Sequence, residues 1–166
     1  PEDLLRDADT AMYRAKKLGR ARHQLFDTSM HARVLSLLVL ESDLRQAEEG
    51  SEFMVVYQPM VRLVDRHVVG YEALLRWLHP RRGLVAQSDF LDLAEETGLI
   101  VSIGSWALTS AVDRLVAWRR RGGSSGGLTV SVNLSARQVS QRELVDQVLR
   151  LVQSRDLPPS ALRLEI

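Results

Sequence analysis

The sequence predicts an α/β fold in which short strands alternate with helices around a parallel sheet. Three segments carry this prediction: Val68 to Trp77, Leu128 to Ser135, and Leu162 to Ile166. In each segment, apolar and polar residues alternate with the two-residue period of a strand. Helical patterns separate the segments, so the three strands are expected to run parallel to one another.

The first fifty residues predict two helices. Apolar residues follow helical spacing from Leu4 to Arg20, with acids in the first turns, bases in the last and Gly19 as a left-handed cap. A short strand is expected from Ala21 to Asp27. A second helix is expected from Met30 to Glu49, with an apolar stripe along one side.

The remaining elements are predicted from their start and stop signals. Pro59 interrupts a strand from Phe53 to Val64, which favours an edge position. Three helices follow. The first helix is capped by Ser88 and ends near Gly98. The third helix opens with a capping box of Ser140 and Glu143 and stops at Pro158-Pro159. The second helix runs from Val101 to Arg121, and its apolar face is formed by Ile103, Trp106, Ala107, Ala111, Leu115 and Trp118.

Glu72, Asn133 and Glu165 lie opposite the apolar face of the three predicted parallel strands. In a parallel barrel such side chains gather at the carboxyl ends of the strands. Carboxylate and amide oxygens suit Mg²⁺ or Mn²⁺ and argue against zinc. The sequence has no cysteine, and its four histidines show no ligand spacing and are expected at the surface. For Glu72 with Arg76 alone, the competing interpretation is an internal salt bridge.

Four segments carry a resemblance to a known family by their order and spacing. They are Tyr57-Gln58-Pro59, Tyr71-Glu72-Ala73-Leu74-Leu75-Arg76-Trp77, Asn133-Leu134-Ser135-Ala136-Arg137-Gln138, and Leu164-Glu165-Ile166. Together they resemble the first half of an EAL domain. The resemblance implies the first part of an EAL-type (βα)8, TIM-like barrel. It also implies a phosphodiesterase that hydrolyses cyclic di-GMP to linear pGpG.

The resemblance assigns roles to five of these residues. Glu72, Asn133 and Glu165 are the implied metal ligands and catalytic residues of a two-metal site that uses Mg²⁺ or Mn²⁺. Arg76 and Gln58 are the implied contacts to the dinucleotide. The family's remaining catalytic residues are expected beyond Ile166, so the truncated chain is expected to be inactive by itself.

The start of the chain resembles the last helix of a GGDEF domain, the diguanylate cyclase fold. Lys16 and Arg20 match the phosphate-contacting bases of that family, although they are also ordinary bases at a helix end. The signature loop of the family is absent, so no cyclase activity is assigned. The expected organisation is the end of a GGDEF-like domain with its terminal helix and strand (1–28), a linker helix (29–50) and a truncated EAL domain (51–166).

Composition excludes some function classes. The net charge of +1 gives no electrostatic reason to expect nucleic acid or a membrane surface as a partner. The expected location is cytoplasmic, with an anchor upstream in the parent protein as an alternative. Two other functions stay open: a catalytically inactive receptor for cyclic di-GMP, and an interaction module that forms a homodimer through the helix from Met30 to Glu49.

Overall fold

The computed structural model describes residues 5, 7–9, 11, 12, 15, 23, 28–121 and 127–166. The chain divides into two compact units, Pro1–Leu44 and Arg45–Ile166. Lys16 and Arg20 lie outside the described residues, as does the predicted strand from Ala21 to Asp27 apart from His23. The predictions about the GGDEF-like segment therefore stay predictions.

The predicted second helix is confirmed as α2, Thr28–Gly50. Its buried residues Leu40, Leu44 and Ala47 are spaced by four and three positions, as on one face of a helix. Leu38 and Val39 are exposed. The structure shows the helix but does not test its role as a linker between domains.

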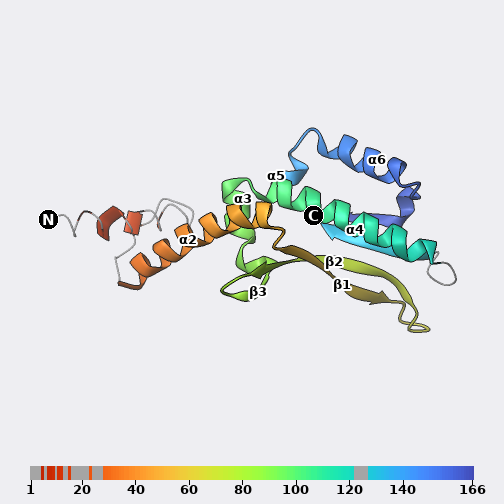
Figure 1. Cartoon of the computed structure of the whole chain (residues 1–166), viewed down its shortest axis with the longest axis horizontal. Coiled ribbons are helices and arrows are strands. Elements are labelled where there is room, and N and C mark those ends of the chain that lie inside the picture. The colour runs from red at the N-terminus through yellow and green to blue at the C-terminus, as the bar shows by residue number, and fades with distance from the viewer. Residues whose placement is uncertain are drawn as a thin grey trace. The chain divides into compact units, whose positions relative to one another are not determined.

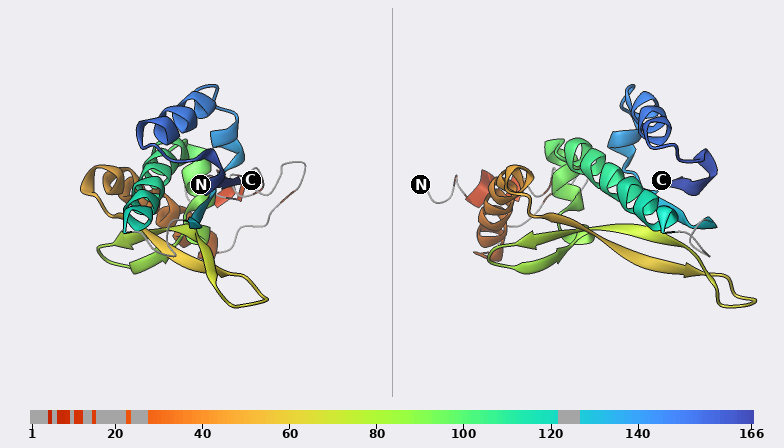
Figure 2. Two further views of the ribbon diagram at one scale, coloured as in Figure 1. Left: turned by 90° about the vertical axis from the view of Figure 1, so that its right-hand side faces the viewer. Right: turned by 45° about the vertical axis from the view of Figure 1, so that its right-hand side comes forward.

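The second unit is built on a five-stranded sheet in the order β1-β2-β4-β5, with β3 also paired to β2. The strands are β1 (Phe53–Val61), β2 (Val68–His79), β3 (Gly83–Ala86), β4 (Thr129–Asn133) and β5 (Leu162–Glu165). β2, β4 and β5 are parallel neighbours, as predicted, whereas β1 and β3 pair antiparallel with β2. Figure 2 shows the long β1–β2 hairpin extending past the neighbouring strands.

Pro59 lies on β1, opposite Tyr71 of β2. β1 is an edge strand, so the missing backbone N–H of proline costs no hydrogen bond on its open side. The predicted strand was too long, because β1 ends at Val61 and Leu63 and Val64 are exposed in the turn that follows. β3 was not predicted, because its four residues, Gly-Leu-Val-Ala, do not alternate between apolar and polar side chains.

Helices cover one face of this sheet. They are η1 (Gln87–Asp89), α3 (Leu91–Thr97), α4 (Ile100–Arg120), α5 (Ala136–Val139), α6 (Leu144–Ser154) and η3 (Pro159–Ala161). α4 lies along the sheet, with α6 on its far side (Figure 1). The core between them joins residues of β2 and β4 to residues of α4 and α6, including Ala73, Leu108, Val112, Leu115, Val130, Val132, Leu151 and Val152.

α4 is the central helix of this core. Eight of its residues are buried, among them Ile103, Ala107, Ala111 and Leu115 of the predicted face. The prediction that Trp106 belongs to the buried face is wrong, because this residue is 43% exposed. By length and composition α4 is also able to cross a membrane, with a mean hydropathy of 1.2. We assign it as a core helix because its apolar residues pack against the sheet.

Two predicted helix starts are wrong. Ser88 lies within η1 and hydrogen-bonds Asp89, and α3 begins after Phe90. The predicted end of this helix near Gly98 is confirmed, and Gly98 is a left-handed cap with φ 85°. The capping box falls on Ser135 and Gln138 at the start of α5, and not on Ser140 and Glu143. Both sites have the same residue spacing, so pattern alone does not select between them.

The expectation of surface histidines is wrong for His79. Its side chain is buried, and its ring lies 4.7 Å from the ring of Trp77. Its Nδ1 accepts a hydrogen bond from the backbone N–H of Arg81. His79 therefore helps to close the turn between β2 and β3.

Candidate functional site

β2 separates a packing face from a polar face. Ala73, Leu75 and Trp77 are buried on the α4 side, whereas Glu72 and Arg76 lie on the opposite side and are partly exposed. This alternation follows from the pleat of a strand. The parity predicted from the sequence is therefore confirmed for this strand.

The register of the strands carries the polar face across the sheet. Gln58 of β1 lies opposite Glu72, and Glu72 lies opposite Ser131 of β4. One same-face step along β4 is Asn133, which lies opposite Glu165 of β5. The three predicted ligands thus come from three adjacent strands and share one face of the sheet.

Two of these side chains are in direct contact. Nδ2 of Asn133 donates a hydrogen bond of 2.7 Å to Oε1 of Glu72. Glu165 is the register partner of Asn133, and neighbouring strands are about 4.8 Å apart. The backbone N–H of Leu134 donates to the carbonyl of Glu165 at 2.7 Å, so the pairing of β4 and β5 continues just past the site.

The donor set of this cluster fits a hard divalent cation. The amide nitrogen of Asn133 makes the hydrogen bond to Glu72, and Oδ1, the atom able to bind a cation, takes no part in it. With the carboxylates of Glu72 and Glu165, the cluster offers only oxygen ligands. Among the described residues, no group of three or more His, Cys, Asp or Glu side chains is suited to a metal.

Arg76 lies apart from this cluster. It is four residues beyond Glu72 on the same strand, a separation of about 13 Å at the rise of a β-strand. Its Nη1 donates to the backbone carbonyl of Leu75 at 2.8 Å. The competing interpretation of an internal Glu72–Arg76 salt bridge is therefore wrong.

The extension of β2 past its neighbour explains the position of Arg76. β4 ends at Asn133, whereas β2 continues to His79 and pairs there with β3. Arg76 accordingly projects beyond the carboxyl end of β4. Gln58, an exposed residue, lies beside Glu72 across the β1–β2 pair.

The structure adds residues that the sequence interpretation missed. Ser131 and Arg163 are aligned with Glu72 across β4 and β5. Ser131 is almost fully buried, and its hydroxyl is 3.9 Å from the Met60 sulfur. Strand parity alone would have placed both residues on the polar face. Gln138, which closes the turn after Asn133, was quoted only as part of a motif.

Tyr57 shows how different the opposite face is. It precedes Gln58 on β1 and packs on the α4 side, where its hydroxyl donates to the carbonyl of Ser110 at 3.4 Å. Burial raises the pKa of Tyr57 above its ordinary value of 10.0, and the nearby Arg114 opposes that rise. The environment on the helix-covered face therefore disfavours the charged form of the Tyr57 side chain.

Comparison with known proteins identifies relatives over most of the chain. Residues 41–166 match the family model described as EAL domain. The bifunctional diguanylate cyclase/cyclic di-GMP phosphodiesterase MucR of Pseudomonas aeruginosa is 43% identical over 164 residues, which cover 99% of this chain and 24% of that protein. The cyclic di-GMP phosphodiesterase PdeR of Escherichia coli is 39% identical over 150 residues, which cover 90% of this chain and 22% of that protein.

Solved structures agree with these relatives. The chain superposes on the PaMucR phosphodiesterase in complex with c-di-GMP with a TM-score of 0.72 and 43% identity, over 79% of this chain and 51% of that one. It also superposes on the EAL enzyme Bd1971, in its cAMP and cyclic-di-GMP bound form, with a TM-score of 0.73 and 28% identity, over 97% of this chain and 42% of that one. The chain therefore spans about half of these structures or less.

Proposed function

Because this chain belongs to the EAL domain family, we propose that it forms the first part of an EAL phosphodiesterase that hydrolyses cyclic di-GMP to linear pGpG. The observation that carries the proposal is the cluster of Glu72, Asn133 and Glu165 on one face of three parallel strands. The chain spans 51% of a solved relative, so we expect hydrolysis only in a protein that carries the complete domain.

We assign the binding of a divalent cation, Mg²⁺ or Mn²⁺, to Glu72, Asn133 and Glu165. EAL phosphodiesterases depend on such metals, and the cluster offers the oxygen ligands that these cations prefer. When bound, divalent cations supply Lewis-acid stabilisation of phosphate charge and a more acidic water. The hydrogen bond from Asn133 to Glu72 holds two of the three ligands together before a cation arrives.

We assign Arg76 and Gln58 to the dinucleotide. Arg76 lies past the carboxyl end of β4, with its backbone about 13 Å from that of Glu72 along β2. A guanidinium is a donor without lone pairs for a metal, so it suits a phosphate or base of the substrate and not a cation. Gln58 lies beside Glu72 and offers an amide at the other side of the site.

The wider organisation is also a proposal. The parallel strands β2, β4 and β5 with their helices suit the opening of a (βα)8 barrel. The alignment with MucR reaches residues before the EAL match, which supports a GGDEF-like segment. Within that segment we assign Lys16 and Arg20 as phosphate contacts. A cytoplasmic location and a homodimer of the complete protein belong to the same proposal.

The presence of Glu72, Asn133 and Glu165 favours an enzyme over an inactive receptor, because a receptor does not need metal ligands for hydrolysis. A comparison of Glu72→Gln with Arg76→Ala in a complete EAL domain tests this assignment. Glu72→Gln keeps the shape of the side chain but removes the charge that binds the cation, so we expect hydrolysis to be abolished. Arg76→Ala is expected to raise KM and to leave cation binding unchanged.

The two variants are separated by a manganese titration, with linear pGpG quantified by chromatography. Added Mn²⁺ is expected to restore part of the activity of Glu72→Gln and none of that of Arg76→Ala. Turnover of Glu72→Gln close to that of the parent at limiting Mg²⁺ would contradict the ligand role of Glu72. An inactive parent that still binds cyclic di-GMP would instead establish the receptor function.

A further inference from the structure

The turn that follows Asn133 is closed by one side chain, that of Gln138. Ser135, two residues after Asn133, is the N-cap of α5, and its hydroxyl accepts from the backbone N–H of Gln138 at 3.2 Å. In return, Oε1 of Gln138 accepts from the backbone N–H of Ser135 at 3.1 Å. α5 has only four residues, so this reciprocal capping box supplies much of its order.

Gln138 is itself held against α4 by Gly104. The Gln138 side chain is only 5% exposed. A Cβ added at Gly104 would lie 2.1 Å from Nε2 and 2.6 Å from Cδ of Gln138, distances that the two groups cannot adopt. Gly104 therefore provides the space in which the amide of Gln138 lies, and the α4 backbone fixes the position of the capping side chain.

Two further contacts fix the same turn. Nη1 of Arg137 donates to the backbone carbonyls of Glu95 and Glu96 at the end of α3. On the other side, the backbone N–H of Leu134 donates to the carbonyl of Glu165. Asn133 thus ends a strand that is followed at once by a turn anchored to α3, α4 and β5.

We propose that Gln138 is a positioning residue for Asn133: its amide, seated on Gly104, fixes the Ser135 turn and so fixes the Asn133 side chain relative to Glu72 and Glu165. The inference rests on the proposed function, because it assumes that these three side chains bind a cation. A ligand must keep its place to within a fraction of an ångström for tight binding. Partners behind the ligands typically contribute about 10-fold to 100-fold to metal affinity.

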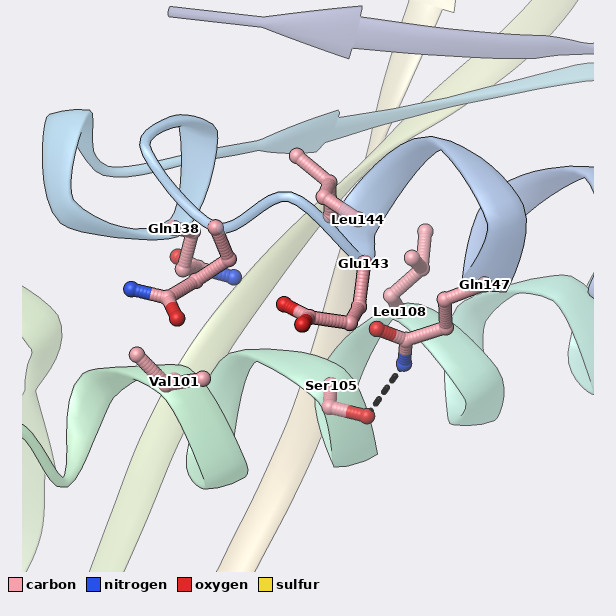
Figure 3. Close-up of a pocket in the computed structure, with 8 residues that line it drawn as sticks. Val101, Ser105, Leu108, Gln138, Glu143, Leu144 and Gln147 are labelled. Atoms are coloured by element: carbon pink, nitrogen blue, oxygen red, sulfur yellow. Dashed lines mark hydrogen bonds between the residues drawn. The ribbon is translucent and has the colours of Figure 1, made fainter.

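Gln147 provides a matched control. It lines the same cavity of about 90 Å³ as Gln138, between α4 and the segment that leads into α6. Figure 3 shows that the amide of Gln147 bonds Ser105 of α4, whereas Gln138 lies nearer Val101. Methionine has the length of glutamine but no amide, so Gln138→Met and Gln147→Met remove comparable groups from one cavity, and only the first acts on the Ser135 turn.

The experiment uses a complete EAL domain and measures two quantities that do not depend on turnover. One is the dissociation constant of Mg²⁺, measured by calorimetry. The other is the NMR signal of the Asn133 side-chain amide, whose Nδ2 bonds Glu72. For Gln138→Met we expect Mg²⁺ binding to weaken by about 10-fold to 100-fold and the Asn133 signal to move. For Gln147→Met we expect less than about a twofold change, because the amide of Gln147 bonds Ser105 of α4 and not the capping residue Ser135.

Two more variants keep the test decisive if Gln138→Met fails to fold. Gly104→Ala displaces the Gln138 amide from the α4 side and is expected to weaken Mg²⁺ binding in the same way. Gln138→Glu keeps the acceptor of the capping box and is expected to retain the Asn133 signal. Parental Mg²⁺ affinity in Gln138→Met or in Gly104→Ala, or equal weakening in Gln147→Met, would overturn the proposal. A parent that binds Mg²⁺ through Asn133 without hydrolysing cyclic di-GMP would contradict the proposed function and leave this inference intact.

Discussion

The two faces of β2 and β4 differ in what they contribute to the protein. On the α4 side, Ala73, Leu75 and Val130 are buried in the core. On the other side, Asn133 hydrogen-bonds Glu72 and lies opposite Glu165, the third proposed metal ligand. Substitutions at consecutive residues of one strand are therefore expected to affect stability and cation binding separately.

The largest effect is expected on the packing face at Trp77. Its ring is fully buried, and its Nε1 donates to Glu52 at 2.9 Å. Trp77→Ala removes these contacts and should lower the free energy of unfolding by about 3–5 kcal/mol. The neighbouring variant Arg76→Ala, on the polar face, should change it by less than about 0.5 kcal/mol. Urea denaturation measures the free energy of unfolding of both variants. Equal decreases in the two variants would contradict the distinction between the packing face and the polar face.

Gly70 of β2 packs closely against Thr129 of β4. A Cβ there would lie 2.3 Å from Oγ1 and 2.6 Å from the backbone oxygen of Thr129. Gly70→Ala should force the parallel strands apart and cost about 1–3 kcal/mol. Gly127→Ala is the control, because a Cβ at Gly127 meets nothing within 4 Å. A midpoint of thermal unfolding in Gly70→Ala equal to that of the control would contradict the close approach.

The sequence was sufficient for the parallel strands because each shows alternation over at least four residues that the structure assigns to a strand. It was also sufficient to place Glu72, Asn133 and Glu165 on one side of those strands. It did not predict β3, because the four residues Gly83–Ala86 include no polar side chain and so show no alternation. The sequence also predicted the capping box at Ser140 and Glu143, which is wrong. Ser135 and Gln138 have the same spacing, and only the structure shows that Gln138 is buried against Gly104.

The relation of Arg76 to Glu72 also needed the structure. A two-residue period places both on one face, but only the register shows that β4 ends before Arg76 is reached. The position of Arg76 depends on where β4 ends relative to β2, which the pattern of β2 alone does not reveal. The sequence therefore predicts which face of a strand a residue occupies better than it predicts the distance between two residues.

On the polar face, a cation should contribute to stability only when all of its ligands are present. At ten times its dissociation constant, Mg²⁺ should raise the free energy of unfolding of a complete EAL domain by about 1.4 kcal/mol. Glu165→Gln should abolish that rise. Without Mg²⁺ the same variant should be about as stable as the parent, because Glu165 is exposed. A full Mg²⁺-dependent rise in melting temperature in Glu165→Gln would exclude Glu165 from the ligand set.

The smallest effect is expected at Tyr57, where the two faces differ in their response to pH. Burial raises the pKa of Tyr57 in the folded state above the ordinary value of 10.0, so the unfolded chain loses this proton first as the pH rises. The stability that depends on neutral Tyr57 is therefore complete below about pH 10 and is lost as the pH rises through the folded-state pKa.

Tyr57→Phe should remove this part of the alkaline decline in stability. At neutral pH the variant should lose about 1 kcal/mol or less, because it lacks the hydrogen bond to Ser110. Gln58→Ala, one residue further and on the polar face, should leave the decline unchanged. Denaturant midpoints measured between neutral and alkaline pH check this, and an equal decline in all three proteins would show that the packing face does not bury the Tyr57 hydroxyl.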